Sequence, residues 1–163
     1  MAFLMALPGW AAQPPARAKS LLGRGISAFE GVRFEEAESL LSEAIAAHPG
    51  WKTASGFRAM SRWTSGDLAG AQRDAKPALG LKPDAPESFA ARGFARFVVK
   101  QYGLASDDFR KASQMDGGYA LARFGLGSVM SQRGQAREAL GHLDEAVRLA
   151  PKAPLFRVPK VVD

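Results

Sequence analysis

The chain has 163 residues, of which 47% are hydrophobic and 23% charged, so its composition excludes a disordered segment and suits one globular domain or a short repeat array. It has no cysteine, which excludes disulfide bonds, thiol catalysis and cysteine-bound metals. The net charge is +6, but most of the excess lies near the two ends, which indicates a mixed surface rather than a continuous basic stripe.

Residues 1–17 form an apolar, proline-rich lead-in, MAFLMALPGWAAQPPAR. An apolar run from Ala2 to Leu7 precedes Gly9 and Ala11, which are spaced like an export cleavage site. The run is short and has no basic residues before it, which leaves two interpretations: a degenerate export signal, or a lead-in that packs on the first helix. We expect a soluble protein, with its location open between the cytoplasm and an exported or periplasmic compartment.

A period of 34 residues organises the rest of the chain. Two series of alanines recur at this spacing, and the second follows the first by seven residues, which places both on one helical face. They are Ala37, Ala71, Ala105 and Ala139, and then Ala44, Ala78, Ala112 and Ala146. A third series of small residues comprises Gly25, Ala59, Gly93 and Gly127. The position five residues after the second alanine, where each unit ends, holds Pro49, Pro83, Gly117 and Pro151.

Small side chains at a fixed interval let neighbouring helix backbones approach closely. Gly66 and Gly134 fall between the two halves of their units and permit a turn, whereas the closing proline cannot continue a helix. Each unit is therefore predicted to be a helical hairpin that buries its faces by stacking on the next one.

The segments FGLGSVMSQRGQAREALGHLDEAVRLAP and FAARGFARFVVKQYGLASDDFRKA resemble the tetratricopeptide repeat (TPR) family. The resemblance implies an all-α fold over residues 18–151, a right-handed superhelix (α-solenoid) of helix-turn-helix hairpins. The units are 18–51, 52–85, 86–119 and 120–153, and residues 152–163 form an extended tail. The predicted first helices are 18–30, 53–65, 87–100 and 120–133, and the second helices are 35–47, 68–81, 103–115 and 136–149.

Pro77 lies inside the second helix of the second unit. A proline there removes a backbone hydrogen bond and clashes with the preceding turn. We expect a kink or a frayed unit at this point.

Arginine and aspartate recur 16 residues apart in two units, as Arg58 with Asp74 and Arg92 with Asp108. Each pair has one member on each helix of its hairpin, so we predict an ion pair within each unit. Such a pair orients the two helices more than it stabilises them, because desolvation offsets much of the Coulomb attraction.

By resemblance, the first helices of the hairpins line a concave groove, and its wall here is apolar and aromatic. Other members that bind acidic chaperone termini use Lys, Asn and Arg at positions where this chain has Leu22 and Ile26, which argues against that activity. We therefore predict a protein or peptide partner of apolar character. The candidate contacts are Ile26, Phe29, Phe57, Met60, Trp63, Phe94, Phe97 and Phe124. The alternative interpretation is that these side chains pack between adjacent helices.

The tail contains Pro154 and Pro159, which prevent a capping helix. The last helix is expected to expose Leu140 and Val147, and apolar tail residues could cover them. The tail could instead occupy the groove or pair with a second molecule, giving self-association through the uncapped end. The apolar tail residues are Leu155, Phe156, Val158, Val161 and Val162.

Motifs for catalysis are weak. The two histidines, His48 and His142, are far apart in sequence, so no metal site or cofactor is predicted. Asp107 and Asp108 are adjacent on a helix and point about 100° apart, which is poor geometry for joint acid–base work. We predict that the protein is not an enzyme but a protein–protein interaction scaffold or adaptor.

Two other functions stay open. The first is binding of nucleic acid or another polyanion, which needs the arginines of the helices to form one exposed track. These are Arg58, Arg62, Arg92, Arg96, Arg123 and Arg133. The second is an accessory helical subunit of a separate enzyme.

Overall fold

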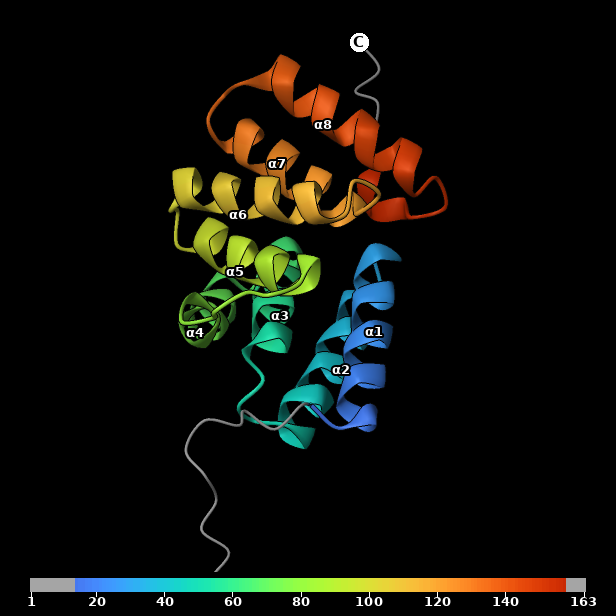
Figure 1. Cartoon of the computed structure of the whole chain (residues 1–163), viewed down its shortest axis with the longest axis vertical. Coiled ribbons are helices and arrows are strands. Elements are labelled where there is room, and N and C mark those ends of the chain that lie inside the picture. Colours follow the sequence, from blue (N-terminus) through green and yellow to red (C-terminus); the bar gives the residue numbers. More distant parts are fainter. Residues whose placement is uncertain (1–13, 158–163) are drawn as a thin grey trace, which may run out of the picture.

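The computed structural model describes residues 14–157 and is all-α, with helices paired into four stacked hairpins that form an α-solenoid (Figure 1). The first helices are α1 (Ala16–Glu30), α3 (Lys52–Ser65), α5 (Pro86–Val98) and α7 (Ala120–Gln132). The second helices are α2 (Phe34–Ala47), α4 (Leu68–Leu79), α6 (Tyr102–Met115) and α8 (Ala136–Leu149), followed by the 3₁₀ turn η1 (Pro154–Phe156). Every helix boundary lies within two residues of its predicted position.

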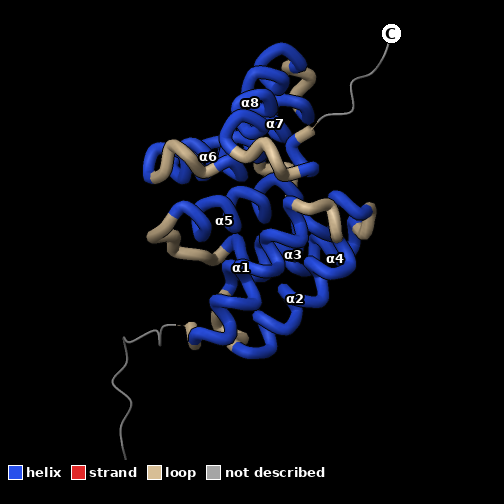
Figure 2. Tube along the Cα trace, turned by 90° about the vertical axis from the view of Figure 1, so that its right-hand side faces the viewer, coloured by secondary structure: helices blue, strands red, loops and turns tan. Residues whose placement is uncertain are grey.

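The described part of the chain contains helices and loops but no strand (Figure 2). The proposed export signal lies largely outside the described residues, as do Val158, Val161 and Val162 of the tail. None of the described helices is long and apolar enough to cross a membrane.

The turn inside each hairpin has one residue with a positive φ, and these residues are again 34 apart. The φ angles are 60° at Val32, 99° at Gly66, 64° at Lys100 and 74° at Gly134. Glycine adopts this conformation readily, whereas a side chain costs about 1–2 kcal/mol because its Cβ meets the following carbonyl oxygen. The turns at Gly66 and Gly134 are thus relaxed, and those at Val32 and Lys100 are strained.

Replacing Val32 with glycine is expected to raise the free energy of unfolding by up to about 1 kcal/mol, because relief of strain exceeds the entropy that glycine adds to the unfolded chain. Little burial is lost, since Val32 is 44% exposed. Urea denaturation measures the change, and Gly66→Ala is the reverse control, expected to lower stability. A Val32→Gly chain that is less stable than the wild type would show that this turn is not strained.

Within a hairpin, a glycine of the first helix lies against a large side chain of the second. A Cβ added to Gly93 would lie 2.7 Å from the ring of Phe109, so only glycine fits beside that ring. The same arrangement joins Gly25 to Leu41 and Gly127 to Leu143, whereas the second unit has Ala59 and Ala75 at these positions. The third series of small residues therefore marks the close contacts inside the hairpins.

Successive hairpins also approach closely in the middle of the stack. A Cβ on Gly56 of α3 would collide with the carbonyl oxygen of Ala91 on α5, so the two backbones touch there. In contrast, α1 makes little contact with α3. The first hairpin stands along the long axis of the molecule, while α5 to α8 run across it (Figure 1).

The helix α4 continues through Pro77 and ends at Leu79, two residues before its predicted end. It has 12 residues, whereas α2, α6 and α8 each have 14. The disturbance expected at the proline thus takes the form of an early helix end.

Candidate interaction surface

Most side chains predicted to line the concave groove lie in the hydrophobic core. Their exposed fractions range from 0% to 9% in Phe29, Phe57, Met60, Phe94, Phe97 and Phe124. Ile26 and Trp63 remain partly exposed, and Trp63 packs edge-on against Phe97 with the ring centroids 4.8 Å apart. The structure therefore corrects the prediction of an open groove at the six buried residues: they pack between helices.

The groove is closed because the C-terminal end of α1 leans onto the middle of the stack. The ring of Phe29 lies 6.4 Å from that of Phe94 on α5 and 6.3 Å from that of Phe124 on α7, both edge-to-face. The rings of Phe57 and Phe109 pack on Phe94 from α3 and α6. The chain thus fills its own concave side with an aromatic cluster.

The 3₁₀ turn η1 completes this closure. Phe156 is 1% exposed, its ring lies 5.6 Å from that of Phe124, and η1 contacts both α1 and α8. The hydrogen bonds of this segment are local: the Phe156 amide donates to Ala153, and the Arg157 side chain donates to the carbonyl of Pro151. Among the described residues, the turn is therefore attached to the helices by side-chain packing alone.

An open space of about 490 Å³ remains between the end of α1 and the segment before η1. It is lined on one side by Ser27, Glu30 and Gly31, and on the other by residues 150–154. The concave side thus keeps room for further chain beside the buried Phe156. Leu140, which the tail was expected to cover, stays 52% exposed.

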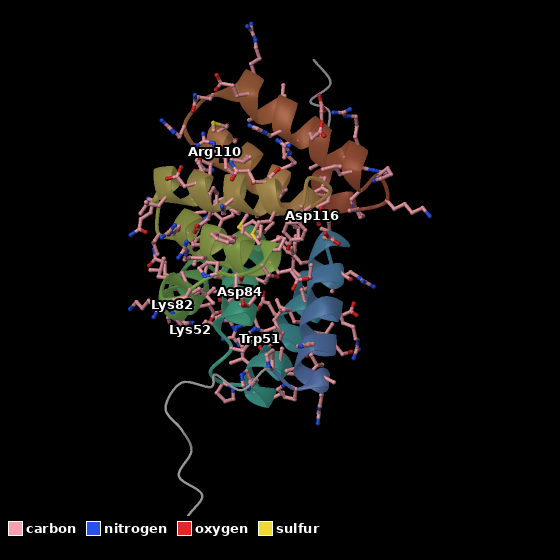
Figure 3. All side chains as sticks on the ribbon, viewed as in Figure 1. Trp51, Lys52, Lys82, Asp84, Arg110 and Asp116 are labelled. Atoms are coloured by element: carbon pink, nitrogen blue, oxygen red, sulfur yellow. The ribbon has the colours of Figure 1, made fainter. Side chains whose placement is uncertain are left out.

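Two further hollows lie outside the concave side. One, of about 520 Å³, opens at the start of α3 and α5, where Trp51, Lys82 and Asp84 lie close together (Figure 3). The other, of about 410 Å³, lies between α7 and α8 and is lined by Arg123, Glu138, Gly141, His142 and Glu145. No group of acidic or histidine side chains in the described residues is arranged to hold a metal ion.

Both predicted ion pairs are confirmed, and each aspartate also binds a second arginine. Asp108 accepts hydrogen bonds from Arg92 at 2.7 Å and from Arg96 at 2.7 Å, and its side chain is 3% exposed. Asp74 is joined in the same way to Arg58 at 2.7 Å and to Arg62 at 3.0 Å. The second arginine follows the first by one helical turn, a spacing that is the same in both units.

Comparison with solved structures places this arrangement among known folds. A TPR protein of Thermus thermophilus, TTC0263, has a TM-score of 0.54 and 17% identity over 82% of this chain and 75% of its own. The TPR domain of Sgt2 from Aspergillus fumigatus has a TM-score of 0.50 and 22% identity over 79% of this chain and 87% of its own. The chain has the tetratricopeptide repeat fold. Comparison with protein families gives no match, nor does comparison with curated proteins.

The arginines of this TPR chain do not form a free basic track. Arg58, Arg62, Arg92 and Arg96 are all paired with Asp74 or Asp108. Each guanidinium group is therefore already engaged by a carboxylate within the fold. Polyanion binding would have to use Arg123 and Arg133 together with arginines that leave their carboxylates.

Titratable groups with shifted pKa values gather at two places in the TPR stack. Burial raises the pKa of Tyr119 well above its usual range, and the carboxylates of Glu87, Glu30 and Asp116 raise it further. Burial also raises the pKa of Glu30, at the end of α1. At the other place, burial and then Arg123 and Arg110 lower the pKa of His142, and Glu138 opposes them.

Proposed function

We propose that the chain is a protein-interaction scaffold whose concave side binds an apolar segment of a partner, in exchange with residues 154–156 of its own tail. The single observation that supports it is the seating of Phe156, which is buried on Phe124 by a segment without hydrogen bonds to α1, α7 or α8. We call the surface beneath it, made by Phe124 and the adjoining parts of α1 and α8, the Phe156 seat.

The energetics favour exchange of the tail with a partner segment that makes more contacts. Burial of one phenylalanine side chain contributes about 1.5–3 kcal/mol, which gives weak affinity to a separate molecule. A short tether raises the effective concentration of the tail to about the millimolar range. A partner segment must therefore add contacts, and the space of about 490 Å³ beside the seat can receive them.

The test uses the full chain with Phe156→Ala and a fluorescent peptide of residues 150–160, followed by anisotropy. We expect this peptide to bind the variant more tightly than it binds the wild type, because the tethered competitor has been removed. A peptide that carries the same substitution should bind neither chain. The peptide should also raise the melting temperature of the variant.

Leu140→Ala is the matched control, because it removes a leucine that is 52% exposed on α8, away from the concave side. It should bind the peptide as weakly as the wild type does. Circular dichroism establishes that both variants are folded. A folded Phe156→Ala chain that neither binds the peptide nor gains thermal stability from it would show that Phe156 is a permanent part of the core.

A further inference from the structure

Arg123 on α7 has no partner within the part of the chain that the structure describes. Its Nε atom is buried without a hydrogen bond, while the residue as a whole is partly exposed and makes no ion pair with a described residue. A buried charged donor without a partner is costly, so such groups are nearly always paired in folded proteins. The buried Nε atom is therefore free to donate to a partner from outside the described residues.

The other units show what kind of group belongs beside the arginines. In the second and third units, a buried aspartate on the second helix, Asp74 or Asp108, forms ion pairs with two arginines of the first helix. The equivalent residue of the fourth unit, 34 positions after Asp108, is His142. The positions equivalent to Arg92 and Arg96 are Leu126 and Met130, so the last hairpin lacks the whole ion pair, and Arg123 stands at a different position on α7.

The acidic side chains near Arg123 do not replace that carboxylate. Glu145 pairs with Arg148 instead, and Glu138 is exposed in the first turn of α8. Both line the same hollow as Arg123, but neither forms a hydrogen bond or ion pair with it. Arg110 adds positive potential from α6, and Figure 3 shows it on the side of that helix that faces the last hairpin. Gly141 lines the same hollow of about 410 Å³, and a Cβ there would meet nothing within 4 Å.

We propose that Arg123 and His142 form a binding site for a carboxylate group of a partner polypeptide. The site lies in the hollow between α7 and α8, whose lining includes no residue of the Phe156 seat, and it does not depend on the proposed function. The Arg123 guanidinium supplies paired donors that match the two carboxylate oxygens, and the protonated imidazole supplies another donor. The open space above Gly141 gives the ligand access.

Carboxylate binding should depend on pH in a defined direction. The groups that face His142 are Arg123 from α7, Arg110 from α6, and Glu138 on its own helix. A bound carboxylate favours the protonated imidazole and therefore raises the pKa of His142. By linkage, affinity should increase as pH falls through the pKa of His142 and should level off below it.

The two histidines allow a direct NMR test on the full chain, with the ring signals of His142 as the probe and those of His48 as the internal reference. His48 packs on Trp51, at the start of α3, and should not respond. Acetyl-Gly-Asp-Gly-amide presents a side-chain carboxylate and acetyl-Gly-Gly-Gly a terminal one, so the two peptides distinguish the source of the group. Acetyl-Gly-Asn-Gly-amide and inorganic phosphate are the comparison ligands.

We expect saturable shifts of the His142 signals, and a higher pKa for this residue, with one or both carboxylate peptides. Arg123→Gln should weaken binding by about tenfold or more, Arg123→Lys should weaken it less, and Glu138→Gln should strengthen it. Equal shifts at His48, equal binding of the asparagine peptide, or tighter binding of phosphate than of either carboxylate would overturn the proposal. Unchanged binding by a folded Arg123→Gln chain would do so as well.

Discussion

Replacing Phe94 with alanine is expected to lower the free energy of unfolding by about 3–5 kcal/mol, because it leaves a cavity at the centre of the aromatic cluster. Phe94 is 0% exposed, and its ring packs against those of Phe29, Phe57, Phe109 and Phe124. The substitution thus removes contacts to four other helices at once. Chemical denaturation gives the size of the loss.

Phe89→Ala is the matched control, because Phe89 lies on the same helix, α5, but is only partly buried. It should cost about 1 kcal/mol. Hydrogen exchange separates local from long-range effects, since Phe94→Ala should also increase exchange in α1 through the lost contact with Phe29. Faster exchange confined to α5 and α6 would mean that the contact across the concave side contributes nothing to stability.

Removal of the Asp108 carboxylate should have the second largest effect. Asp108→Ala leaves Arg92 and Arg96 half-buried and unpaired, and we expect a loss of about 3 kcal/mol. The side chain of Asp108 is 3% exposed, so salt should screen the interaction little. Denaturation at low salt and in about 1 M salt should therefore give similar losses.

The neighbouring aspartate offers a close comparison. Asp107 is 68% exposed and pairs with Arg110 at 3.3 Å on the surface of α6. Asp107→Ala should change stability by less than about 0.5 kcal/mol. Equal losses at the two positions would show that burial of the Asp108 network has no energetic importance.

The helical hairpins could be predicted from the sequence because the recurring small residues mark the positions where neighbouring helix backbones lie close together. Small residues recur wherever two helices touch, and the contact of Gly93 with Phe109 shows the physical reason. The ion pair of Arg92 with Asp108 was predictable on the same basis, since both residues occupy equivalent places in two units. Local pattern and tertiary contact agree at these positions.

The closed concave side could not be read from the repeat, because the repeat describes each hairpin relative to the next and assumes that every junction is alike. The junction between the first two hairpins differs, and Phe29 crosses to α5 and α7. A signal was nevertheless present. A continuous wall of phenylalanines would have exposed a large apolar patch, which folded proteins rarely leave uncovered.

The unpaired Arg123 escaped prediction for a different reason. Its position in the repeat is occupied by Ser55 and Phe89 in the two preceding units, so no series marks it. Only the geometry shows that Glu145 pairs with Arg148 and not with Arg123. A residue that departs from the pattern of its repeat can thus form a binding site that the repeat itself does not predict.

The meeting of Phe29 and Phe156 on the same ring, Phe124, changes how the array should come apart. In a linear repeat array, the terminal units unfold first because each one packs against a single neighbour. Here α1 and η1, the first and last helical elements of the described residues, both pack on Phe124, so neither can separate from the stack without losing that contact. Loss of either should loosen the other, and the molecule should melt as one cooperative body rather than from its tips.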